Sequence, residues 1–200
     1  MKQNQIQAMQ QAIKSEHYDI SENHIIFPSL SIAVSGEYQY RVNDGEIQRS
    51  KNLITTEGLT HILNVAMGST PKPTAYYIAP FNGSAAPQNN WTAANFAAIA
   101  GEITSQTEGY TNATRPVWTP TTATGNSIDN IGNGNEDLSK AAKLIIATTS
   151  QLNITGLALI TSAAKGATTG ALISTSKFPI ARTLQNGDTF YASYRISLTE

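Results

Sequence analysis

The chain has 200 residues and a formal net charge of −1, and only 14% of its residues are charged, against roughly 25% in an average soluble protein. It contains no cysteine, which excludes disulfide bonds, thiolate metal sites and a cysteine nucleophile. No lysine and arginine run is long enough to neutralise a row of phosphates, no stretch approaches the ~20 apolar residues of a membrane span, and the first residues lack a signal peptide's apolar core, so neither nucleic acid nor a membrane is an expected partner.

The first expected element is an N-terminal arm, residues 1–24, that begins with a short helix. Ile6, Met9 and Ile13 recur at helical spacing among good helix formers. The apolar strip that they form is narrow, and a helix this short is marginal on its own. These three residues are therefore candidate docking residues, which pack either on the chain's own domain or on a partner protein; disorder in isolation is a third interpretation.

Residues 25–200 are expected to form one domain, because short β-type runs follow one another along this range. In the run at 37–42, apolar and aromatic residues alternate with polar ones, which is typical of a half-buried strand. The turn Asn43-Asp44-Gly45 that follows indicates a hairpin. The other early strands are expected at 25–27, 30–34 and 46–50.

A helix is predicted next, capped by Thr55 or Thr56 and ending at Gly68. Its apolar residues fall on one face, and they are Leu59, Ile62, Leu63 and Ala66. The middle of the chain, about 69–135, is rich in Pro, Gly, Asn and Thr. It is expected to form long loops on a rigid scaffold, with a short helix at 93–100.

Strand patterns return in the last third of the chain, at 141–148, 153–160, 171–174 and 189–198. The last of these follows the turn Asn186-Gly187-Asp188. Several short strands separated by turns predict a mainly β fold, an antiparallel β-sandwich of the jelly-roll or immunoglobulin-like type. One or two short helices are expected in the sandwich domain, in addition to the helical arm.

The polar residues form no recognisable catalytic or metal-binding motif, so no cofactor or metal is expected. The stretch 129–137 offers oxygen ligands to calcium, but a flexible surface loop is the favoured interpretation. His17, His24 and His61 are scattered and lack metal-ligand spacing. A carboxylate pair for glycoside hydrolysis is not fixed by any spacing; its candidates are Glu102, Glu108, Asp129, Glu136 and Asp137.

Aromatic residues cluster in the loop-rich middle, and two interpretations of them are open. They form a contact surface for a carbohydrate or a protein partner, or they fill the core beneath the long loops, which is the favoured interpretation. The candidates for the contact surface are Tyr76, Tyr77, Phe81, Trp91, Tyr110 and Trp118.

Several segments resemble small virion proteins of tailed bacteriophages. Residues 38–47 (YQYRVNDGEI) and 51–59 (KNLITTEGL) resemble the strand, turn, strand and helix start with which such proteins open. Further similar segments are AYYIA at 75–79, ITGLAL at 154–159 and GDTF at 187–190. The resemblance covers about residues 38–198, and the N-terminal arm and the long middle loops depart from the compact form.

The resemblance implies a structural protein of the virion, made in the host bacterial cytoplasm, and not an enzyme. The leading expectation is a capsid decoration or cement protein that binds the assembled shell. The alternative is a neck or collar component, or a tail-fibre or receptor-binding component, of the same kind of particle. A polysaccharide-degrading enzyme is a remote alternative. The expected partners are the major capsid protein, or neck and tail proteins, together with further copies of the chain itself.

Overall fold

The computed structural model describes residues 19–20, 25–26, 33–123, 125–131 and 138–199. The chain divides into two compact units, residues 1–33 with 199–200 and residues 34–198. In the smaller unit, β1 (Asp19–Ile20) pairs antiparallel with β2 (Ile25–Ile26). The expected arm helix, with its candidate docking residues Ile6, Met9 and Ile13, lies outside the described residues. The predicted arm boundary at residue 24 stays a prediction.

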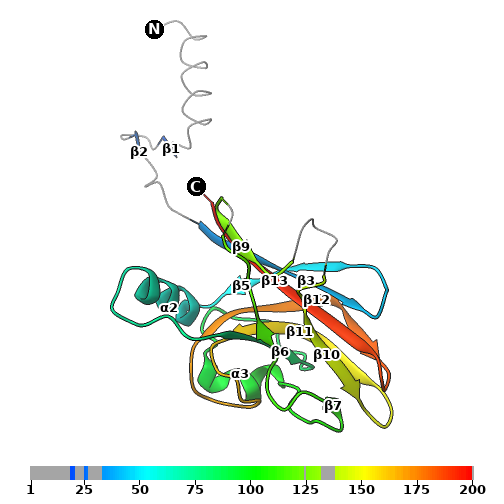
Figure 1. Cartoon of the computed structure of the whole chain (residues 1–200). Helices are drawn as coiled ribbons and strands as arrows, with labels where there is room; N and C mark the ends of the chain where they lie inside the picture. Colours follow the sequence, from blue (N-terminus) through cyan, green and yellow to red (C-terminus); the bar gives the residue numbers. More distant parts are fainter. Residues whose placement is uncertain (1–18, 21–24, 27–32, 124, 132–137, 200) are drawn as a thin grey trace, which may run out of the picture. The chain divides into compact units, whose positions relative to one another are not determined.

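The larger unit is an antiparallel β-sandwich, which confirms the predicted fold class (Figure 1). The strands of the first sheet are β3 (Ala33–Val42), β4 (Gln48–Lys51), β7 (Gly109–Tyr110), β9 (Ser127–Asp129), β10 (Ala142–Ala147) and β13 (Thr189–Thr199). Those of the second sheet are β5 (Leu53–Ile54), β6 (Tyr76–Phe81), β8 (Val117–Trp118), β11 (Leu152–Ile160) and β12 (Leu172–Leu184). The strand orders are β4-β3-β13-β10-β7, with β9 also paired to β13, and β5-β12-β11-β6-β8.

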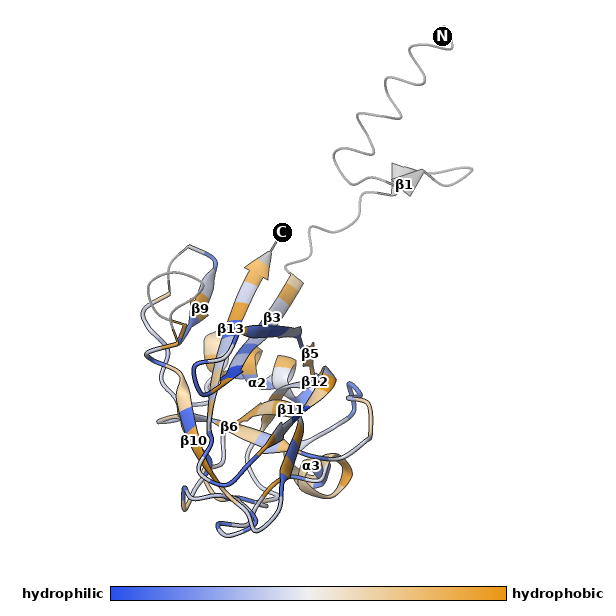
Figure 2. Ribbon diagram, turned by 90° about the vertical axis from the view of Figure 1, so that its right-hand side faces the viewer, coloured by the Kyte–Doolittle hydropathy of each residue, from blue (hydrophilic) through white to orange (hydrophobic). Residues whose placement is uncertain are grey.

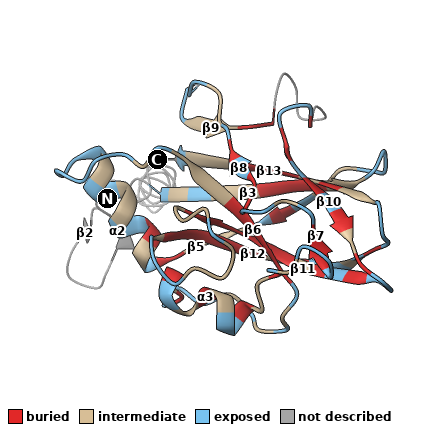
Figure 3. Cartoon of the chain, turned by 60° about the horizontal axis from the view of Figure 1, so that its bottom comes forward, coloured by how far each residue is buried: buried red, intermediate tan, exposed pale blue. Residues whose placement is uncertain are grey.

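The main core lies between the two sheets, where Figure 3 shows the buried residues. Tyr38 on β3 and Tyr194 on β13 pack with their ring centroids 4.5 Å apart. The Tyr38 hydroxyl lies 2.8 Å from the Ser174 hydroxyl on β12, a hydrogen bond that joins one sheet to the other. Burial raises the pKa of Tyr38 well above its ordinary value, so this hydroxyl stays neutral. Hydrophobic and hydrophilic residues alternate along β13 in Figure 2, because only one face of a strand meets the core.

A second, smaller core lies on the outer face of the second sheet. There α3 (Ala93–Ala100) packs against β6 and β11, with the rings of Phe81 and Phe96 edge to face at 6.0 Å. This helix was predicted at the same residues. Thr92 and Asn95 form a capping box at its start, and Gly101 ends it with a left-handed backbone at φ 65°.

Strand β12 continues well beyond the predicted end at residue 174. Its register with β11 passes from Lys177, opposite Gly156, to Arg182, opposite Ile154. Residues 178–181 therefore have no partner in the register, and they include Pro179, which cannot donate a backbone hydrogen bond. The predicted strand stops before this proline is reached, because the polar run Ser174–Lys177 shows no alternation of apolar and polar residues.

The two predicted turns, at 43–45 and 186–188, bind each other at one end of the first sheet. Asn43 takes a left-handed backbone at φ 49°, and its side-chain oxygen accepts a hydrogen bond from the Thr189 N–H at 2.8 Å. The Asn43 amide donates to Asp188 at 2.8 Å, and the second carboxylate oxygen of Asp188 accepts from the Gln185 N–H at 2.7 Å. These hydrogen bonds, that from Gln185 first, lower the pKa of Asp188.

This lowered pKa makes part of the fold's stability depend on pH. A carboxylate whose pKa is lower in the folded state stabilises the fold above its unfolded pKa, and this contribution disappears as the pH falls through the folded pKa. We expect Asp188→Asn to lower the melting temperature at neutral pH, and the gap to the unsubstituted protein to close well below about pH 4. Thermal unfolding followed by circular dichroism at a series of pH values measures this gap. Asp44→Asn, an exposed carboxylate in the facing turn, is the matched control; a pH-independent gap for Asp188→Asn would contradict the prediction.

Candidate functional site

Helix α2 (Thr56–Ala66) is fixed to the second sheet at its first turn. The Thr55 side chain accepts a hydrogen bond from the Gly58 N–H at 2.9 Å and donates one to the Leu172 carbonyl. Gly58 is buried, and a Cβ at this position would overlap the Ile173 carbonyl oxygen. Because only glycine allows this close approach, the contact determines which face of α2 turns toward the sheet.

Both ionisable side chains of α2 make contacts with the sandwich. One carboxylate oxygen of Glu57 accepts hydrogen bonds from the N–H groups of Ala93 at 2.7 Å and Leu172 at 2.6 Å, so it links α2 to α3 and β12. The His61 Nε2 lies 3.1 Å from the Tyr76 hydroxyl, and partial burial lowers the pKa of His61. The imidazole is therefore mainly neutral at neutral pH. The opposite side of the helix, which faces away from the sheet, carries no ionisable residue.

That opposite side of α2 exposes large apolar side chains to water. Leu59 is 41% exposed, Leu63 63% and Met67, the residue that caps the helix end, 87%. Their spacing of four residues places them in one row along the helix, which we call the α2 strip. Figure 3 shows α2 at the periphery of the sandwich. The strip is the candidate functional site, because neighbouring exposed apolar residues mark surfaces that bind other molecules.

An apolar cavity of about 470 Å³ opens beside α2, at the end of the sandwich where β3 begins and β13 ends. Ile173 on the second sheet, Ile196 on the first and Ile62 on α2 supply parts of its wall. Tyr76 and Trp118 supply an aromatic part, with their rings edge to face at 6.0 Å. Its volume falls within the usual range of small-molecule sites.

The structure separates the aromatic residues that the sequence grouped as a contact surface. Phe81, Trp91, Tyr110 and Trp118 are buried, so the contact-surface interpretation does not hold for these four, and the core-filling interpretation does. Tyr76 and Trp118 meet at the wall of the cavity, and Tyr77 packs half-buried against the second core. The sequence pattern shows where aromatic residues cluster, but not to which side of a sheet each one points.

Glu102, one of the carboxylates considered for catalysis, forms a fully buried ion pair. Its two oxygens accept hydrogen bonds from the Nε and Nη2 of Arg115, each at 2.7 Å. Glu102 also accepts from the Gly166 N–H at 3.1 Å, and Arg115 donates to the Ser162 carbonyl at 2.8 Å. The pair thereby ties the loops around residues 102–115 to the loop at 162–166.

Glu108 is likewise held by hydrogen bonds. It accepts from the Thr149 N–H at 3.2 Å and from the Thr148 hydroxyl at 2.9 Å. These hydrogen bonds, those of Thr149 first, lower the pKa of the Glu108 carboxyl. A general acid needs a raised pKa, so this shift is opposite to the one that the acid of glycoside hydrolysis requires.

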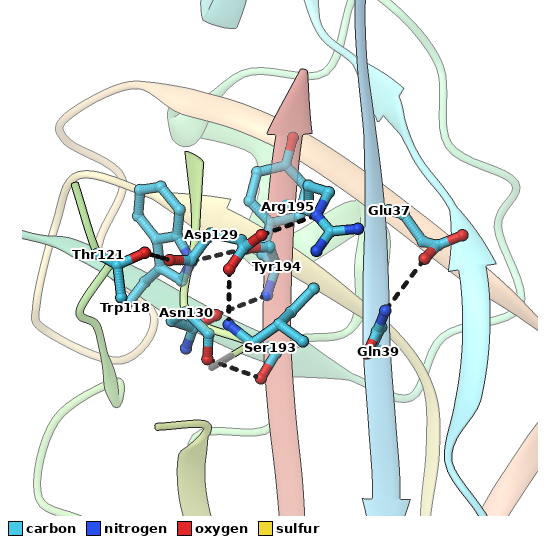
Figure 4. A network of polar contacts seen from close by, with 10 residues as sticks. Glu37, Gln39, Trp118, Thr121, Asp129, Asn130, Ser193, Tyr194 and Arg195 are labelled. Atoms are coloured by element: carbon cyan, nitrogen blue, oxygen red, sulfur yellow. Dashed lines mark hydrogen bonds and ion pairs between the residues drawn. The ribbon is translucent and has the colours of Figure 1, made fainter. Parts of the chain in front are cut away.

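Asp129 belongs to a network that joins β9 to β13 (Figure 4). Its carboxylate accepts a hydrogen bond from the Arg195 Nε at 2.8 Å. The neighbouring Asn130 accepts from the Tyr194 N–H at 2.8 Å, and the Trp118 indole donates to the Tyr194 carbonyl at 3.0 Å. This network holds Trp118 at the wall of the cavity.

Some of the remaining candidate residues for metal binding and catalysis lie outside the described residues. Residues 132–137, which include most of the oxygen-rich stretch and both Glu136 and Asp137, are not among the described residues. Among those that are described, no group of three or more His, Asp or Glu side chains is placed to hold a metal ion. In the same part of the chain, no helix is long and apolar enough to cross a membrane.

No protein-family model and no curated protein sequence matches this chain. Inference about its function therefore rests on the α2 strip, the cavity and the contacts around them.

We expect Gly58→Ala to destabilise the fold, although alanine favours a helix over glycine by about 1 kcal/mol. The added Cβ overlaps the Ile173 carbonyl, so α2 must move away from β12, and overpacking of this kind typically costs about 1–3 kcal/mol. Urea unfolding measures the change in the free energy of unfolding. Thr60→Ala, on the exposed side of the same helix, is the control and should change it by less than about 0.5 kcal/mol. Undiminished stability of Gly58→Ala would show that this contact does not set the position of α2.

Arg115→Met should lower the free energy of unfolding by about 3–5 kcal/mol, because it leaves the Glu102 carboxylate buried without its cation. The double variant Glu102→Gln/Arg115→Met removes that uncompensated charge and should be more stable than the single variant. Urea unfolding of both variants, with Glu102→Gln alone, completes a double-mutant cycle. If the double variant has no higher free energy of unfolding than Arg115→Met, the stability of these loops does not depend on the ion pair.

Proposed function

We propose that this chain is a structural protein of a tailed-bacteriophage particle, which acts by binding other proteins. The α2 strip carries this proposal. Its three side chains are large, adjacent and 41–87% exposed, and burial against a protein partner would remove this apolar surface from water. The helix beneath the strip is rigidly placed by Gly58, Thr55 and Glu57, so the surface is formed before any partner arrives.

The contacts of the carboxylates favour binding over catalysis. Hydrolysis of a glycoside requires two carboxyl groups that both face the substrate. Glu102 is occupied by Arg115, Glu108 by Thr148 and Thr149, and Asp129 by Arg195. Each of these three carboxylates thereby stabilises a loop or a strand, and within the described part of the chain none of them is paired with another carboxylate across a shared site.

The resemblance to virion proteins supports the assignment to a phage particle. The similar segments 38–47 and 51–59 correspond to β3, the hairpin after it and the first turns of α2. The resemblance thus includes Leu59, the first residue of the strip. Within the particle we propose the role of a capsid decoration or cement protein, which stabilises the assembled shell because it binds that shell in preference to its free subunits.

We expect the chain to be present in purified particles of the phage that encodes it, at a copy number that follows the number of capsomers. Gel densitometry of purified particles measures this copy number, and a cryo-electron map locates the chain. A small copy number, matching a single ring of subunits, would indicate a neck or tail role instead of the decoration role. Absence of the chain from the particles would refute the proposal.

Leu63→Asp should weaken retention on particles that lack the chain at least about tenfold, which corresponds to about 1.4 kcal/mol. Co-sedimentation of the purified variant with such particles measures this retention. Ile180→Asp is the matched control, because Ile180 is similarly apolar and 69% exposed but lies on β12. Equal retention of the two variants would show that the α2 strip is not the binding surface.

A further inference from the structure

We propose that the α2 strip pairs with the same strip of a second copy of this chain, forming a dimer with two-fold symmetry. The inference rests on the proposed function, in which the chain binds other proteins of the particle. It assigns the strip to contact between copies of the chain, so that Leu63→Asp weakens retention because it separates the attached copies. Figure 1 shows α2 at the side of the sandwich, and the side chains of the strip are exposed there.

The charge of the α2 surface favours a second copy of the chain as the partner. In a two-fold pair of identical surfaces, a charged group near the axis lies against its own copy and is repelled by it. The exposed side of α2 is formed by leucine, methionine, threonine, asparagine and alanine. Glu57, the only carboxylate of the helix, is engaged with the N–H groups of Ala93 and Leu172, so two copies can meet without repulsion. This surface has no charged group that could pair with those of a strongly charged partner.

The spacing of the strip's residues also favours pairing with a second copy. Leu59 and Met67 each lie four residues from Leu63, on either side of it. An antiparallel pair of helices with its two-fold axis at Leu63 therefore places Leu63 against itself and Leu59 against Met67 of the second copy. In the same register Thr60 faces Ala66 of the second copy, whose small side chain permits close approach of the helices.

The size of the strip predicts a weak dimer. The 11 residues of α2 span only about 16 Å, and three side chains cover much less than the roughly 800 Å² per partner of a typical stable interface. The dimer should therefore dissociate on dilution and form where the chain is concentrated, as it is on the surface of a particle. Two attached copies would then hold the particle more tightly than one, through their raised effective concentration.

The absence of cysteine from the sequence makes a single introduced thiol a clean test of this symmetry. Helix axes about 8–10 Å apart place two facing Cα atoms roughly 4–5 Å apart, within reach of a disulfide. We expect the full-length Leu63→Cys protein to form a covalent dimer under mild oxidation, at least tenfold faster than Ile180→Cys at the same concentration. Non-reducing gel electrophoresis over time measures the two rates.

Analytical ultracentrifugation of the unsubstituted protein provides a second, non-covalent measurement. The average mass should rise from monomer toward dimer with concentration, and Leu63→Asp should weaken the association at least tenfold while Ile180→Asp leaves it unchanged. Leu63 is mostly exposed, so its variants should fold, and circular dichroism checks this.

The outcomes separate this inference from the proposed function. Equal cross-linking rates for the two cysteine variants, with a monomeric mass at every concentration, would overturn the dimer. If the chain were nevertheless present in particles and lost by Leu63→Asp, the strip would bind a different virion protein, and the proposed function would stand. A dimer in solution, with no chain in the particles, would support the dimer and refute the proposed function.

Discussion

The position of α2 depends on the backbone contact between Gly58 and the Ile173 carbonyl. No other residue type fits at this point, so the helix can lie against β12 on this side only. Thr55 and Glu57 then add hydrogen bonds from the same helical turn to Leu172. The apolar row on the far side is a geometric result of this attachment, because residues buried and exposed on a helix are related by its fixed period.

Charged side chains have structural roles elsewhere in the sandwich. With few ionisable residues in the chain, several of those described serve to fix loops and turns: Arg115 with Glu102, Arg195 with Asp129, and Asp188 with Asn43. Charged groups used in this way cannot also cover the surface. The exposed surface therefore carries few charged side chains beside its hydroxyl, amide and apolar groups, which suits extensive contact with neighbouring proteins.

The sequence pattern predicted the mainly β sandwich, both of its helices and the turns at 43–45 and 186–188, because these depend on local residue order. Tyr38 and Tyr40 alternate with polar residues as a half-buried strand must, and Gly187 marks its turn directly. It did not predict which way α2 faces, since its four apolar residues suggested a buried face whereas Leu59, Leu63 and Ala66 are exposed. That orientation is decided by Gly58, whose significance appears only when β12 lies beside it. Glycine inside a predicted helix was the one local signal of close packing.

The place of β13 between β3 and β10 also constrains how the chain acquires its fold. The hydrogen bonds between Asn43 and Asp188 join residues 145 positions apart. During synthesis, β3 and β4 can form their hairpin early, but the edge of β3 stays unpaired until β13 has left the ribosome. Contacts so distant in sequence slow folding, and an open strand edge invites association between nascent chains. The rate of folding, and the yield of folded protein at high expression, should therefore be limited by the arrival of the C-terminal strand.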